Sequence, residues 1–214
     1  WAADFDLATH PGAVLHDVDS AQVVADTIRA ALTSSEDAHV ILVELAPPVV
    51  FGEVAARWGR QLFGSGRVAV SQMGGSFYYG YGHQSGCARE YNVAHNATAS
   101  QLLMGAPELG ARSFALSPLD TSSLVRIEGD LWQQLLLAVG SGRERPLLER
   151  VLDSYRAWKR NCPSDPFGLM CGSADPEHNS GNMFDAQAAA FAGVIARHGD
   201  DQMLACADVR TLRV

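Results

Sequence analysis

The spacing of hydrophobic residues along the chain alternates between helical and strand-like periods. Apolar positions recur every three or four residues in six segments, and four short apolar runs have the profile of buried strands. The string Asp17-Val18-Asp19 precedes the first helical segment, and we interpret it as a helix cap. The pattern predicts helices over 20–31, 51–63, 97–104, 127–139, 146–159 and 185–197, and strands over 40–45, 68–71, 113–116 and 203–207.

Strands that alternate with helices are typical of a mainly parallel α/β sheet flanked by helices. In such sheets, binding and catalytic sites lie beyond the carboxyl ends of the strands, so the loops that follow strands are the first candidates. A loop rich in glycine and tyrosine follows the second strand over 74–87, and residues 1–18 show no regular period. We therefore expect one α/β domain over 1–214, with an irregular N-terminal segment over 1–18.

Composition narrows the class of protein. The 214 residues are 47% hydrophobic, which is enough for one substantial core. The 16 basic and 24 acidic residues give a net charge of -8, which argues against nucleic acid or an anionic membrane surface as a partner. No apolar run approaches the roughly 20 residues that a membrane-spanning helix needs.

The cysteines and one asparagine bear on the cellular compartment. Cys162 and Cys171 flank a loop rich in proline and glycine, which a disulfide could close; the alternative is two unpaired thiols. Asn96-Ala97-Thr98 is an acceptor sequence for N-glycosylation. Together these features favour a secreted or other extracytoplasmic location.

Three segments that follow predicted strands or open a helix carry candidate chemistry. Met73 begins a Met-Gly-Gly turn in which the backbone can approach a ligand closely. Glu90 and Asn92 could bind the hydroxyls of a sugar, or they could be a loop pair that satisfies itself. Asp185 could cap the helix that it opens, or it could be a metal ligand. His83 is the histidine best placed to face a pocket.

Taken in order, five strings resemble the nucleoside hydrolase family of the inosine- and uridine-preferring type. They are HVILVELAPPVV, MGGSFYYG, EYNVAHNATAS, LSPLDTS and NMFDAQAAAFA, and the resemblance covers roughly residues 20–214. It implies an α/β fold, hydrolysis of the N-glycosidic bond of ribonucleosides, and a bound calcium ion. It further implies that Glu90 and Asn92 bind ribose, that Met73 forms a wall of the sugar pocket, and that Asp185 is a calcium ligand.

The chain departs from the family in the part that binds metal. The family's aspartate cluster on its first strand is missing, so the sheet is expected to lack that strand and no catalytic residue is assigned. Val49-Val50 replaces a threonine and an asparagine, and Phe184 stands where many members have a histidine. One carboxylate each from Asp185 and Glu90 cannot hold a calcium ion that takes six to eight oxygens.

Two interpretations follow from this incomplete site. A second chain, such as a cleaved N-terminal fragment or another subunit, could restore the site and its calcium. Alternatively, the chain is a non-catalytic structural or interaction subunit of a larger assembly, which Val49-Val50 slightly favours. Either way we expect a protein partner, or residues 1–18 folded over the gap, because loss of a strand exposes backbone edges and apolar faces.

Overall fold

Three parallel strands form the sheet at the centre of the fold. The computed structural model describes residues 19–78, 90–140, 149–150, 152–153, 156, 178–180 and 183–198. In these residues the sheet has the order β1-β2-β3, with β1 at Val40–Glu44, β2 at Val68–Met73 and β3 at Ser113–Ser117. Val40 pairs with Val68, and Ala69 with Ser113. The prediction of a parallel α/β sheet flanked by helices is confirmed.

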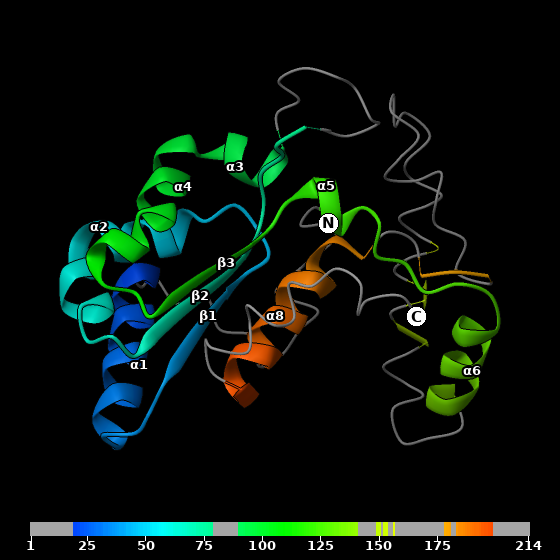
Figure 1. The fold of residues 1–214 in the computed structure, drawn as a ribbon, viewed down its shortest axis with the longest axis horizontal. Helices are drawn as coiled ribbons and strands as arrows, with labels where there is room; N and C mark the ends of the chain where they lie inside the picture. Colours follow the sequence, from blue (N-terminus) through cyan, green and yellow to red (C-terminus); the bar gives the residue numbers. More distant parts are fainter. Residues whose placement is uncertain are drawn as a thin grey trace, which may run out of the picture.

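Helices cover both faces of this sheet (Figure 1). The helices of the described residues are α1 (Ser20–Ser34), α2 (Val49–Phe63), α3 (Tyr91–His95), α4 (Ala97–Met104), the 3-10 turn η3 (Ala106–Leu109), α5 (Leu119–Ser122), α6 (Gly129–Gly140) and α8 (Phe184–His198), of which α6 lies apart from the sheet. Helices α1, α2 and α4 share one hydrophobic core with β1 and β2. Helix α8 packs on the opposite face, where Ile195 contacts Ala69 and Ala115.

The central strand β2 is buried along its whole length because helices lie on both of its faces. Val68 and Val70 face the core that contains Leu62 and Phe63 of α2. Burial of a side chain of this size contributes about 1.5–3 kcal/mol. Ser71 faces α8 instead, and its hydroxyl donates to the carbonyl of Ala188 at 2.7 Å. This hydrogen bond explains how a polar residue fits into a buried strand.

Helices α2 and α4 approach each other closely at Gly52. A Cβ atom at this position would lie 2.6 Å from both the Cβ and the carbonyl oxygen of Ala99. No larger side chain fits without separating the two helices. This contact fixes α4, and with it the preceding helix α3, beside the carboxyl end of the sheet.

Several element boundaries differ from those predicted. The first helix continues from residue 31 to Ser34, where the hydroxyls of Thr33 and Ser34 bond to carbonyls of the preceding turn and extend the helix without an apolar signal. Strand β2 extends two residues beyond 71, and α2 begins two residues before 51. Asp19 caps α1 as expected, since its carboxylate accepts from the N–H of Gln22 at 3.0 Å.

Some predictions lie outside the described residues. They concern the segment over 1–18, the strand over 203–207, most of the helix over 146–159, His83, and the pair Cys162 and Cys171. In the part of the chain that is described, no helix combines the length and the apolar character that a membrane span requires.

Candidate functional site at the carboxyl ends of the strands

The carboxyl ends of β2 and β3 are joined through the turn that follows β2. Gly74 donates its N–H to the carbonyl of Ser117 at 3.2 Å, and Leu119 donates to the carbonyl of Gly75 at 3.0 Å. Gly75 has a φ of 79°, a conformation that glycine adopts at little cost. The Met-Gly-Gly turn is therefore held between two strands, at the edge where ligands of parallel sheets bind.

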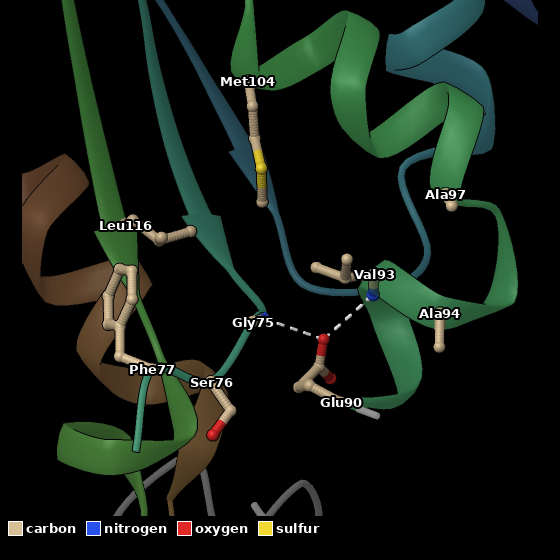
Figure 2. Close-up of a pocket in the computed structure, with 9 residues that line it drawn as sticks. All are labelled: Gly75, Ser76, Phe77, Glu90, Val93, Ala94, Ala97, Met104 and Leu116. Carbon is tan, nitrogen blue, oxygen red and sulfur yellow. Dashed lines mark hydrogen bonds between the residues drawn. The ribbon is translucent and has the colours of Figure 1, made fainter. Parts of the chain in front are cut away.

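Glu90 is buried, with 3% of its surface exposed, and its carboxylate is an acceptor for three backbone N–H groups. Oε2 accepts from Gly75 at 2.8 Å and from Val93 at 2.9 Å, and Oε1 accepts from Asn92 at 2.8 Å. Figure 2 shows the carboxylate between the turn and α3. Glu90 is thus the N-cap of α3 and also ties this helix to the loop after β2.

Asn92 brings a second predicted site residue against the same turn. Its Nδ2 donates to the carbonyl of Met73 at 3.2 Å and lies 3.3 Å from the Met73 sulfur. Asn92 is buried, and Met73 is 4% exposed between Leu119 and Ala188. The structure therefore brings Met73, Glu90 and Asn92 into one hydrogen-bonded group.

Asp185 lies in the first turn of α8. Desolvation, and then the negative charge of Glu90, raise the pKa of the Asp185 carboxyl, although the residue keeps more than a third of its surface exposed. It is the second residue of the helix and so lies inside the first turn rather than at the N-cap. A carboxylate in this position is stabilised by the helix dipole.

Asp120, on α5, lies near this site and is not among the candidate residues that the sequence motifs indicate. Its two carboxylate oxygens each accept at 2.7 Å, from the N–H groups of Phe77 and Tyr78. This pair of bonds holds the loop beyond Gly75 against α5. Asp120 belongs to the string LSPLDTS of the family resemblance, but no role was assigned to it from the sequence.

A pocket of about 590 Å³ opens beside Glu90 (Figure 2). Its walls are mainly apolar, with Val93 and Met104 from the helices, Leu116 from β3 and Phe77 from the loop. The carboxylate of Glu90 is the charged group at its edge. Such a pocket suits an apolar or flat group carrying a hydrogen-bond donor.

A second polar feature lies on the sheet face that α1, α2 and α4 cover. Glu44 and Gln72 are register partners on β1 and β2, so their side chains lie on the same face of the sheet. Gln72 is fully buried, and neither polar atom of its side chain has a hydrogen-bond partner in the described structure. Burial raises the pKa of Glu44, although its Oε1 accepts from the N–H of Ala46 at 3.1 Å.

The remaining predicted positions have structural roles. Asn96 is the N-cap of α4, with its Oδ1 accepting from Ala99 at 3.0 Å. Phe184 packs against the core around Met73. Val49 is 42% exposed at the start of α2.

The described residues do not fit a calcium ion. They contain no group of three or more histidine, cysteine, aspartate or glutamate side chains placed to hold a metal. Calcium takes six to eight oxygen ligands, whereas both oxygens of Glu90 already accept from backbone N–H groups. Asp185 would be a single carboxylate ligand.

The chain was compared with protein-family models, curated proteins and solved structures. No protein-family model, no curated protein and no solved structure matches the chain.

Proposed function

We propose that the chain is nucleoside-hydrolase-like and that its site recognises the ribose of a ribonucleoside. The observation that carries this proposal is the hydrogen-bonded group of Met73, Glu90 and Asn92 at the carboxyl end of β2. Its members come from two separate strings of the family resemblance. Asp185, whose pKa is raised by desolvation and then by the charge of Glu90, comes from a third string. Amide and carboxylate groups at such an edge suit the hydroxyls of a sugar.

The family reaction is hydrolysis of the bond between ribose C1′ and a base nitrogen. Water adds to C1′ as that bond breaks, the base leaves with the bonding electron pair and gains a proton, and ribose and free base are the products. The described residues offer no oxygen cluster for the metal that activates this water in the family. We therefore propose that the chain is inactive alone and needs a second chain to complete the site.

A non-catalytic role is the second candidate, and the contacts of Glu90 favour it. Its carboxylate accepts three backbone N–H groups, so its present role is to hold α3 and the loop after β2 in place. In this alternative, the chain keeps the fold as a structural or interaction subunit of a larger assembly. The same partner would be needed, but no ribonucleoside would be bound.

Isothermal titration calorimetry with inosine and uridine separates the two candidates, because ribose recognition requires binding whether or not turnover occurs. We expect saturable binding that Asp185→Ala weakens by at least about tenfold, which corresponds to 1.4 kcal/mol. Asp130→Ala, in the first turn of α6, is a matched control and leaves binding unchanged. Absence of heat at millimolar nucleoside would contradict ribose recognition and leave the structural role. Equal binding by both variants would contradict the part assigned to Asp185.

Turnover is tested separately, by following base release from inosine in the presence of saturating calcium. We expect no release by the chain alone. Turnover by the isolated chain would show that the site is complete without a partner.

A further inference from the structure

Gln72 carries an amide whose hydrogen-bonding atoms are unused. The side chain is fully buried, and in the described structure neither Nε2 nor Oε1 has a hydrogen-bond partner. Burial of an amide without a hydrogen bond is unfavourable. The preceding positions on the same face of β2, Val68 and Val70, are apolar and belong to the hydrophobic core. An amide at the next position therefore needs a reason that the packing of the chain does not supply.

Gln72 lies at the base of the pocket beside Glu90. Its register partner on β3 is Leu116, which lines the pocket, so both side chains leave the sheet on the same face. A Cβ atom added to Gly74 would lie 3.4 Å from Nε2 of Gln72. It would lie equally 3.4 Å from Oε2 of Glu90 and from Cγ2 of Val93, which both belong to residues that line the pocket. The donor end of the amide is therefore close to the pocket walls.

The amide can turn toward the pocket without losing a hydrogen bond. Glutamine has three rotatable side-chain bonds, and no hydrogen bond holds either polar atom of Gln72 in the described structure. The pocket offers the room, since its volume of about 590 Å³ is in the range of sites for small organic ligands. A ligand group that meets the amide gains hydrogen bonds that the free chain does not make.

Three features of the pocket define the ligand group. Both polar atoms of the amide are unsatisfied, so the matching group presents an acceptor and a donor side by side. The carboxylate of Glu90 lies at the edge of the pocket and disfavours an anion. The other walls are mainly apolar and include the ring of Phe77, as Figure 2 shows, which suits a flat ring. A neutral cyclic amide, or lactam, combines all three properties.

We propose that the pocket binds a lactam ring and that Gln72 is the residue that recognises it. Nε2 of Gln72 donates to the lactam carbonyl, and Oε1 accepts from the lactam N–H. The ring then lies between Phe77 and the side chains of Val93 and Met104. This inference stands on the pocket and on the buried amide, and it depends neither on ribose recognition nor on turnover.

The test titrates the full 214-residue chain with 2-pyridone, a flat lactam that contains no sugar. The chain is labelled with ¹⁵N in its side-chain amides and with ¹³C in its methyl groups. We expect saturable shifts of the Nε2 protons of Gln72 and of the methyl groups of Val93 and Met104 at millimolar 2-pyridone. The methyl signal of Ile195, which packs on the opposite face of the sheet, remains unchanged.

Two comparisons separate recognition by the amide from filling of an apolar pocket. N-methyl-2-pyridone keeps the ring and the carbonyl but lacks the donor, and we expect it to bind at least about tenfold more weakly. Gln72→Leu should bind 2-pyridone at least about tenfold more weakly than the native chain and should bind both compounds equally. Gln61→Leu, at an exposed position of α2, is the matched control and keeps the native affinity. The two compounds test the native chain even if Gln72→Leu does not fold.

Four results would overturn the proposal. Unchanged signals of Val93 and Met104 at millimolar 2-pyridone would mean that the pocket does not bind a lactam. Equal affinity of the native chain for both compounds, or native affinity in Gln72→Leu, would mean that the ring binds without the amide. A cross-peak between the Nε2 protons and long-lived water in the free chain would mean that bound water satisfies the amide. Because 2-pyridone contains no sugar, none of these results bears on ribose recognition.

Discussion

Replacing Glu90 by glutamine removes the charge that holds the turn after β2 against α3. The native carboxylate accepts the N–H groups of Gly75, Asn92 and Val93 at 2.8–2.9 Å. Glutamine keeps one acceptor oxygen, and its amino group faces at least one of these N–H groups. That N–H then loses its acceptor in a buried position.

The cost follows from these three bonds. A hydrogen bond to a charged group contributes about 1.5–3 kcal/mol and a neutral one about 0.5–1.5 kcal/mol, while an unsatisfied buried donor costs about 1–3 kcal/mol. Relief of the repulsion between Glu90 and Asp185 offsets a small part of the loss. We expect Glu90→Gln to lower the free energy of unfolding by about 2–4 kcal/mol.

Urea unfolding at pH 7 measures this loss, and amide exchange locates it at Gly75 and Val93. Glu108→Gln, at an exposed position of η3, is the matched control and should change the free energy of unfolding by less than about 0.5 kcal/mol. NMR titration should also show a lower pKa of Asp185 in Glu90→Gln, because this variant lacks the negative charge of Glu90 that raises the pKa. A Glu90 variant as stable as the control, with unchanged exchange at Gly75, would refute the assigned role of Glu90.

Three further substitutions test the packing and the buried polar groups. Gln72→Leu should raise the free energy of unfolding by about 1–3 kcal/mol in urea titrations, because both polar atoms of this buried amide lack a partner in the described structure; equal or lower stability would contradict that. Gly52→Ala should lower the melting temperature, since its Cβ would lie 2.6 Å from the carbonyl oxygen of Ala99, whereas Gly193→Ala meets no atom within 4 Å and should leave it unchanged or raise it; similar shifts in both would rule out the close approach of α2 and α4. Burial raises the pKa of Glu44 above its unfolded value, so protonation favours the folded state and this contribution is lost as the pH rises through the folded pKa. Glu44→Gln should therefore be more stable than the native chain at pH 7 and equal to it below about pH 4, and urea titrations with the same difference at both pH values would refute this.

The hydrophobic period of the sequence predicted most of the elements that the structure describes. The helices over 20–31 and 51–63 and the strands over 40–45 and 68–71 are all present, with boundaries that shift by a few residues. The hydrophobic pattern did not predict helix α3, because five residues are too few to show a helical period. It begins at Glu90, whose carboxylate bonds to Gly75 from the preceding turn, a contact that local pattern cannot indicate.

The residues of the candidate site were also predicted only in part. The motifs singled out Met73, Glu90 and Asn92, and the structure places them in contact. From spacing alone, Glu90 could bind a sugar or could form hydrogen bonds only within its own loop. Its three backbone hydrogen bonds support the second role. Asp120 and Gln72 were missed because their environments are formed by residues distant in sequence, such as Phe77 for the aspartate.

Side-chain NMR of the full chain during a titration with inosine tests the central claim, that the group around Asn92 recognises ribose. The Nδ2 protons of Asn92 and the methyl group of Met73 report directly on this group, and neither signal requires turnover. We predict saturable shifts of both signals, and a shift of the same signals with ribose alone, while the methyl signal of the distant Ile195 remains unchanged. Unchanged Asn92 and Met73 signals at millimolar inosine would contradict the claim.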